Sequence, residues 1–285
     1  MSTSPHEIIL AECMGLCGGV KHALALFAQI RRELPEENRL YVMHELVHNR
    51  YVTDGMRARN AVFIRQASEL PAGATVLIGA HGLDIGDERR LRLRAGRVID
   101  ATCPMVKRLQ QAAAALSGEE QMVFFGTPGH PEVSGVISYN PHGVCHAIAS
   151  AGEVASLPEL PRPVLFCQTT LNAEESRQVF AALQARFPNA QRVAPVCNAS
   201  SERQAAVLAL LPNVDALVVV GSANSSNANR LREIGAMHGV PSWLVDAAAQ
   251  LPPQLHQCRR IGITAGASTP EEQIRAIINA IQGQE

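Results

Sequence analysis

The chain has 285 residues, of which 47% are hydrophobic and 18% charged, with 25 basic and 26 acidic side chains. This length can bury a large core in one large or two to three small domains, and a net charge of −1 gives no electrostatic footprint for nucleic acid or an anionic membrane. Because no apolar stretch is long enough for a transmembrane helix and the start MSTSPHE lacks a secretion signal, we expect a cytoplasmic protein without a membrane partner.

Short β-branched apolar runs alternate with longer helical patterns, which is typical of βα units and parallel sheets. The predicted strands are 7–10, 40–43, 62–64, 75–80, 97–100, 122–125, 144–149, 163–167, 192–196, 216–220, 242–245 and 260–264. They form three groups of four. We therefore predict an α/β fold of three pseudo-symmetric parallel βα modules. Their expected boundaries are 12–96, 97–190 and 191–285, with 1–11 as the leading strand of the first module.

The first strand of each group leads to a cysteine and then a helical pattern, in MGLCGGVKHA, DATCPMVKRL and APVCNASSER. Cys17, Cys103 and Cys197 lie 86 and 94 residues apart, close to one third of the 285 residues. Open α/β sheets bind ligands beyond the carboxyl ends of their strands. If the three modules face one another with these ends inward, the three cysteines meet at one central site.

Three thiolates without a fourth protein ligand suit either zinc with an open position or an iron–sulfur cluster with one iron free for substrate. The spacing lacks the paired C-x-x-C of zinc ribbons, which favours the cluster. The alternative is that each is a buried small hydrophobic residue. Cys13 and Cys17 alone could also be a disulfide or redox pair, but seven cysteines is an odd number and cytoplasmic disulfides are rare. Cys13 has no counterpart before the other two cysteines, so we interpret it as a neighbour of the site; the remaining cysteines, which we interpret as structural or incidental, are Cys145, Cys167 and Cys258.

Polar loops follow several predicted strands. GSANSSN (221–227) offers backbone N–H groups, hydroxyls and amides to an anion at a helix N-terminus, and ASTPEE (267–272) is similar, although ordinary helix capping explains either loop alone. His48, His81 and His130 each follow a strand and can donate to phosphate without a fixed charge.

Glu132 in GHPEV is the only carboxylate in this layer that lies in a loop framed by glycine and proline. Next to a cluster and an anion, its pKa is expected to rise, which suits a proton donor. The alternative is a first-turn glutamate that the helix dipole favours. Thr169 and Thr170 can hydrogen-bond substrate or relay a proton.

Several motifs together resemble those of the LytB family of 4-hydroxy-3-methylbut-2-enyl diphosphate reductases: HELVHNRYV, GAHG, DATCP, GHPEV, QTTL, GSANSSNANRL and TAGASTP. The resemblance covers nearly the whole chain. It implies a [4Fe–4S] cluster with one open iron, held by Cys17, Cys103 and Cys197. It also implies a diphosphate site formed by His48, His81, Ser225, Ser226, Asn227 and Ser268. His130, Glu132 and Thr169 are then expected to face the substrate's hydroxymethyl end as catalytic residues, with His130 also binding substrate.

The implied reaction is reductive dehydroxylation to isopentenyl and dimethylallyl diphosphate, the last step of the methylerythritol phosphate pathway. Electrons are expected from a ferredoxin or flavodoxin. The chain departs from the family pattern before Cys17, where Glu12–Leu16 replace Asn-Pro-x-Gly-Phe, and after Cys197, where Asn198–Ser200 replace Tyr-Ala-Thr. Two alternatives stay open: a paralogous iron–sulfur reductase of a related allylic diphosphate, and a non-enzymatic iron–sulfur sensor.

Overall fold

The computed structural model describes residues 6–193 and 196–283. The chain divides into two compact units. The first unit consists of Met1–Lys21, Val47–Met56 and Asn198–Glu285, and the second of His22–Leu46 and Arg57–Cys197. The first unit contains one four-stranded sheet and the second contains two, as far as the described residues extend.

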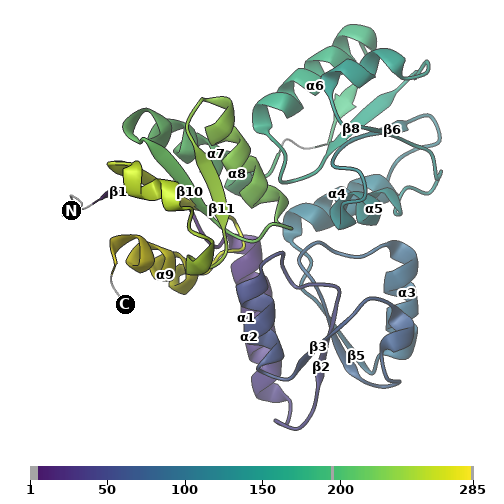
Figure 1. The fold of residues 1–285 in the computed structure, drawn as a ribbon. Coiled ribbons are helices and arrows are strands. Elements are labelled where there is room, and N and C mark those ends of the chain that lie inside the picture. The colour runs from purple at the N-terminus through teal and green to yellow at the C-terminus, as the bar shows by residue number, and fades with distance from the viewer. Residues whose placement is uncertain (1–5, 194–195, 284–285) are drawn as a thin grey trace. The chain divides into compact units, whose positions relative to one another are not determined.

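The described residues form strands that overlap all twelve predicted positions, the predicted strand 192–196 only at Arg192, and the strands alternate with helices (Figure 1). The strands are β1 (Glu7–Leu10), β2 (Leu40–Met43), β3 (Ala61–Ile64), β4 (Thr75–Ile78), β5 (Arg97–Asp100), β6 (Gln121–Phe125), β7 (Cys145–Ile148), β8 (Pro163–Cys167), β9 (Gln191–Arg192), β10 (Ala216–Val220), β11 (Ser242–Val245) and β12 (Arg260–Ala265). The helices are α1 (Gly18–Glu33), α2 (Arg50–Arg57), α3 (Ile85–Arg94), α4 (Pro104–Ala114), α5 (Pro131–Ile137), α6 (Ala173–Arg186), α7 (Asn198–Leu210), α8 (Ser226–Met237) and α9 (Glu271–Gln282).

The sheet of the first unit has the order β1-β12-β10-β11, and all its pairs are parallel. Because side chains alternate along a strand, β10 buries both of its faces. Leu217 and Val219 pack with residues of α7 and α8, whereas Val218 and Val220 pack with residues of α9. Figure 1 shows α7 and α8 on one face of this sheet and α9 on the other.

The two sheets of the second unit have the orders β3-β2-β4-β5 and β7-β6-β8-β9. Each repeats the topology of the first unit's sheet, and β6 is likewise buried on both faces. Met122 and Phe124 pack with residues of α4 and α5, whereas Val123 and Phe125 pack with residues of α6. The predicted α/β class, built from three groups of four parallel strands, is therefore present.

The sheets group the leading strands differently from our prediction. We assigned strand 7–10 to the first module and strand 97–100 to the second, but β1 pairs with β12 and β5 pairs with β4. β9 likewise pairs with β8, and residues 194–195 of the predicted strand 192–196 lie outside the described residues. β5 and β9 thus complete the sheets that precede them in the chain, and β1 completes the sheet formed by the last three strands.

The helix that follows β5 does belong to the next module. Val106, Leu109 and Ala113 of α4 are buried against the β6–β8 sheet, because this apolar stripe finds its hydrophobic partners there. The module boundaries 12–96, 97–190 and 191–285 therefore stay a prediction. The pairing of the leading strands with β12, β4 and β8 does not follow these boundaries.

Each sheet has two central strands, which are β10 and β12, β2 and β4, and β6 and β8. The strand order reverses between the two central strands of each sheet. Such a reversal opens a crevice at the carboxyl ends of the two strands, where α/β sheets bind ligands. The loops that begin there are 44–49, 79–84, 126–130, 168–172, 221–225 and 266–270. They contain most of the polar residues predicted to form the site. None of the described helices is long and apolar enough to cross a membrane.

Candidate functional site

The three predicted ligand cysteines make equivalent backbone hydrogen bonds. In each case the cysteine N–H donates to the carbonyl that lies two residues beyond a central strand. The pairs are Cys17 with Ala267 (3.0 Å), Cys103 with Ala80 (2.9 Å) and Cys197 with Thr169 (3.3 Å). The repeat seen in the sequence is therefore also a repeat in local structure, and it selects the same three cysteines.

Each of these cysteines also immediately precedes a helix. The Cys17 carbonyl accepts a 2.9 Å hydrogen bond from the Lys21 N–H, and the Cys103 carbonyl accepts one of the same length from the Lys107 N–H. These are the first backbone hydrogen bonds of α1 and α4. A helix N-terminus stabilises a thiolate, the form that binds metals. All three thiols are half-buried, and no disulfide joins any cysteines in the described part of the chain.

Cys13 lies in a bulge that the strand before Cys103 does not share. The N–H groups of Ala11 and Gly15 bond to the carbonyls of Ile263 and Ala265, so the chain advances four residues while its partner advances two. Before Cys103 the two strands stay in step, through bonds from Ala101 to Ile78 and from Cys103 to Ala80. The absence of a counterpart to Cys13 thus has a structural basis.

The remaining cysteines have environments that favour the neutral thiol. Burial raises the pKa of Cys145 to about 12. Burial also raises the pKa of Cys167, whose sulfur lies 3.2 Å from the Ser176 hydroxyl. Partial burial and the charge of Asp215 raise the pKa of Cys258. Because the thiolate is the metal ligand, these environments suit the structural role that we predicted.

Four predicted site residues come together in the second unit, in the loops that follow β4, β6 and β8 and in the first turn of α5. Glu132 is 1% exposed; its Oε1 accepts from the Thr169 N–H at 2.6 Å and its Oε2 from the Thr169 hydroxyl at 2.8 Å. His130 caps α5, because its Nδ1 accepts from the Glu132 N–H at 3.1 Å. The ring of His81 meets that of His130 edge-on, with centroids 5.9 Å apart. Acceptance at Nδ1 places the proton of a neutral His130 ring on Nε2.

Predicted anion-binding residues likewise come together in the first unit. The Ser268 hydroxyl donates to the His48 carbonyl at 3.0 Å, and the Asn227 Oδ1 accepts from the Ala267 N–H at 2.9 Å. Ser225 caps α8, in which Ser226 is the first residue. The Asn227 side chain is 3% exposed, and its Nδ2 has no hydrogen-bond partner among the described residues. A buried amide donor without a partner is rare, and it suits a site whose ligand is an anion.

Sequence reasoning missed the residues that brace these loops. Asn49 is fully buried: its Nδ2 donates to the Gln273 side chain at 2.9 Å and its Oδ1 accepts from the Val52 N–H at 3.0 Å. The Ser222 hydroxyl accepts from the Arg50 N–H at 2.8 Å. Asn49 directly precedes α2, so the preference of asparagine for helix starts was the available signal.

Gln168 braces the second unit in the same way. It is fully buried, and its Oε1 accepts from the Thr127 N–H at 2.8 Å while its Nε2 donates to the Thr170 hydroxyl at 3.0 Å. The Thr170 hydroxyl, which we predict beside Thr169 to bind substrate or relay a proton, accepts this bond. Thr169 is the threonine that contacts Glu132.

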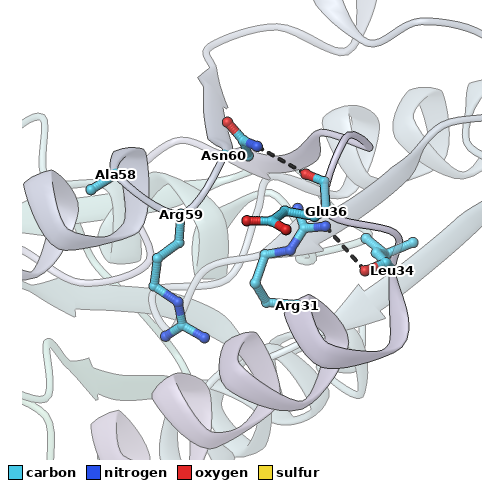
Figure 2. A pocket seen from close by; sticks show the side chains of 6 residues that line it. All are labelled: Arg31, Leu34, Glu36, Ala58, Arg59 and Asn60. Atoms are coloured by element: carbon cyan, nitrogen blue, oxygen red, sulfur yellow. Dashed lines mark hydrogen bonds between the residues drawn. The ribbon is translucent and has the colours of Figure 1, made fainter.

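Two surface cavities of about 340 Å³ each lie within the units. The first, at the amino ends of β2 and β3, is lined by no predicted site residue; Figure 2 shows its lining side chains, including the hydrogen bond from the Asn60 amide to the Glu36 carbonyl. The second borders the predicted anion loop, through Gly221 and Ala223.

Neither unit by itself contains, among its described residues, a group of three or more His, Cys, Asp or Glu side chains that could hold a metal ion. Cys17 belongs to the first unit, whereas Cys103 and Cys197 belong to the second.

A sequence model of the LytB protein family matches residues 8–282. The chain belongs to the LytB family. Its curated LytB relatives include the 4-hydroxy-3-methylbut-2-enyl diphosphate reductases of Neisseria gonorrhoeae (strain NCCP11945) and Azoarcus sp. (strain BH72). Each is 38% identical over 283 residues, which cover 97% of this chain and 87% and 90%, respectively, of the relatives.

Solved LytB structures share the fold. The reductase from Plasmodium falciparum aligns with a TM-score of 0.90 at 26% identity, over 97% of this chain and 88% of that one. A second solved structure, described as the terminal enzyme of the non-mevalonate pathway, aligns with a TM-score of 0.68 at 31% identity, over 98% of this chain and 99% of its own. The family resemblance and the α/β class with three parallel sheets are thus confirmed.

Proposed function

We propose that the chain is a 4-hydroxy-3-methylbut-2-enyl diphosphate reductase, which forms isopentenyl and dimethylallyl diphosphate in the last step of the non-mevalonate pathway. One observation carries most weight. Thr169 donates two hydrogen bonds to the buried Glu132 carboxyl, and its carbonyl accepts the N–H of Cys197. A group able to hold a proton is therefore joined, through one residue, to a predicted ligand of a redox cofactor.

The donor set fits the cofactor. Three half-buried thiols in equivalent positions, each at the start of a helix, suit a [4Fe–4S] cluster held by Cys17, Cys103 and Cys197. When bound, the cluster would pass on, one at a time, the two electrons that the reaction needs, and it would offer an iron that has no cysteine ligand. Because the chain shows no nucleotide-binding glycine fingerprint, we propose a ferredoxin or flavodoxin as electron donor.

The diphosphate suits the hydroxyl, amide and imidazole donors of the two units. In the first unit we assign it to His48, Ser225, Ser226, Asn227 and Ser268, and in the second unit to His81. Three features support this assignment: the helix N-terminus of α8, the unsatisfied Asn227 amide, and the absence of fixed negative charge among these side chains. Bound phosphate oxygens would accept the Asn227 Nδ2 proton.

Replacing the substrate hydroxyl with hydrogen consumes two electrons and two protons and releases water. We assign delivery of the proton to the leaving hydroxyl to Glu132, with the Thr169 hydroxyl between the carboxyl and the substrate. His130, whose Nε2 carries its ring proton, is assigned to donate a hydrogen bond at the same end of the substrate. The Thr169 hydroxyl donates to the Glu132 carboxyl, and the Glu132 N–H donates to the His130 Nδ1, so the three groups are fixed relative to one another.

The test begins with anaerobic purification, iron and sulfide analysis, and steady-state turnover with reduced methyl viologen. Glu132→Gln is expected to keep its iron but to lose at least about 100-fold in turnover, because general acid catalysis contributes roughly that much. Glu174→Gln, an exposed glutamate on α6, is the matched control and is expected to retain turnover. A cluster-loaded wild type that does not turn over the substrate, or a protein that binds only zinc, would contradict the proposal.

A further inference from the structure

The first unit contains a buried arginine whose partners are all uncharged. Arg203, on α7, is 4% exposed. Its Nε and Nη2 donate to the Gly15 carbonyl at 3.1 and 2.6 Å, and its Nη1 donates to the Ala199 carbonyl at 2.6 Å. No carboxylate among the described residues forms an ion pair with it. Carbonyls satisfy the guanidinium's hydrogen bonds, but they leave its full positive charge uncompensated.

A buried charge is costly unless an opposite charge lies close to it. Both of Arg203's acceptors lie next to predicted cluster ligands in the chain: Gly15 is two residues before Cys17, and Ala199 is two residues after Cys197. Gly15 has φ +73°, and a Cβ added there would lie 3.2 Å from the Ile274 side chain and 3.3 Å from the Thr269 carbonyl oxygen, so the conformation that presents the Gly15 carbonyl to Arg203 favours glycine. The Arg203 guanidinium is therefore hydrogen-bonded to the backbone two residues before one proposed ligand cysteine and two residues after another.

A [4Fe–4S] centre with three thiolates carries a net charge of −1 when its core is 2+, and −2 after the addition of one electron. We infer that Arg203 is the fixed counter-charge of this centre and raises its reduction potential, a positioning and tuning role that rests on the proposed function. A fixed cation stabilises the more negative, reduced state more than the oxidised state. The effect is strongest where water is excluded, as it is around a side chain that is 4% exposed.

The competing explanation is that Arg203 only braces the loop before Cys17. Two substitutions separate the explanations. Arg203→Lys keeps the charge but loses the planar fork that reaches Gly15 twice, whereas Arg203→Gln keeps a hydrogen-bond donor but loses the charge. A bracing role predicts that both variants change the centre similarly, and a charge role predicts that only Arg203→Gln does.

The experiment measures the reduction potential of anaerobically reconstituted protein by a redox titration followed by electron paramagnetic resonance. Arg203→Gln is expected to shift the potential negative by about 59 mV, equivalent to a tenfold change in the one-electron equilibrium constant. Arg203→Lys is expected to stay close to wild type. Arg275→Gln, which removes an exposed arginine of α9 in the same unit, is the control for net charge and is also expected to stay close to wild type.

Equal shifts in the Arg203→Lys and Arg203→Gln variants, or no shift in either with the cluster bound, would contradict the inference while leaving the proposed function intact. If Arg203→Gln does not retain a cluster, iron content decides: retention by Arg203→Lys alone supports the charge role, and loss by both variants contradicts it. A wild-type protein that forms no iron–sulfur centre contradicts the proposed function and this inference together.

Discussion

Cys13 and Cys17 lie four residues apart, but their backbones are held differently. The Cys17 N–H donates to Ala267 and its carbonyl begins α1, as at Cys103, whereas Cys13 sits in the two-residue bulge. Cys17→Ser is therefore expected to lose most bound iron and sulfide, since serine is a poor replacement for a thiolate ligand. Cys13→Ser is expected to keep wild-type content. Iron and sulfide analysis of both anaerobically purified variants checks this, and the reverse result would show that the bulge has been placed on the wrong cysteine.

At the residue scale, the sequence identified site residues that recur at equivalent positions of the three modules. It did not identify residues whose role depends on contacts between distant parts of the chain. Cys17, Cys103 and Cys197 could be selected because the repeat compares three copies of one position. The direct bonds between Glu132 and Thr169 join residues 37 positions apart. The sequence therefore predicted only that the loops carrying these two residues meet, and not that the residues bond to each other. Arg203 could not be distinguished from an exposed helical arginine, because its burial depends on the Gly15 loop, 188 residues away.

Among the elements, the loop after β4 depends on a glycine without positive φ. A Cβ added at Gly79 would lie 2.3 Å from the Glu45 carbonyl oxygen, because the Ala80 N–H bonds to the Leu46 carbonyl at 2.9 Å and holds the two loops together. Gly79→Ala is expected to lower the free energy of unfolding by at least about 2 kcal/mol, the cost of a backbone shift. It also displaces the loop that carries His81.

The matched control for that substitution is Gly55→Ala. Gly55 lies inside α2, and a Cβ there would meet nothing within 4 Å. Alanine at this position is expected to stabilise the protein by about 0.5–1 kcal/mol through the lower backbone entropy of the unfolded chain. Urea denaturation of both variants measures the contrast. Equal stabilities would mean that the loops after β2 and β4 separate without cost.

A second element-scale contact joins α3 to the end of α5 in the second unit. Burial alone would raise the pKa of Glu88, but hydrogen bonds from Tyr139 and Arg92 outweigh it and hold the pKa of this carboxyl below its usual value. Burial and the bond to Glu88 also raise the pKa of the Tyr139 hydroxyl. A carboxyl whose folded pKa is lowered stabilises the fold above its unfolded pKa of about 4.3, and that stabilisation is lost as pH falls through the folded value.

Glu88→Gln is accordingly expected to cost about 1–2 kcal/mol at pH 7, the value of a charge-assisted hydrogen bond. The difference from wild type is expected to shrink as pH falls below about 4, where the wild-type carboxyl becomes protonated as well. Urea denaturation between pH 3 and 8, with Glu174→Gln in parallel, checks the trend. A difference that is constant with pH would indicate a packing effect rather than an ionised carboxyl.

The strands themselves were predictable, but the partners of the leading strands were not. Eleven of the twelve strands lie where apolar β-branched runs predicted them, because these runs are local signals, whereas the predicted strand 192–196 overlaps β9 only at Arg192. We predict that β1, β5 and β9 group with the helices that follow them, whereas hydrogen bonding places β5 and β9 in the preceding sheets and β1 in the sheet of the last three strands. The pairing of β1 with β12 joins residues about 250 positions apart, for example Glu7 with Arg260, and no local pattern specifies such a pair.

For the whole molecule, the division of the proposed ligands between the two units has a thermodynamic consequence. Cys17 belongs to the first unit, and Cys103 and Cys197 to the second. A cofactor that binds residues of both units only when both are folded makes their unfolding interdependent and stabilises both by mass action. We therefore expect anaerobic cluster-loaded protein to unfold in one thermal transition, and the cluster-free protein to unfold at lower temperature in two.

Differential scanning calorimetry of the two forms, with Cys17→Ser as a third sample, tests this coupling. Cys17→Ser removes the single ligand that the first unit contributes, so it is expected to unfold like the cluster-free wild type. Cys13→Ser, which alters the same loop without removing a proposed ligand, is expected to unfold like the loaded protein. An identical single transition with and without the cluster would mean that the two units are already coupled by the polypeptide alone, because loss of the shared ligand would then leave their cooperativity unchanged.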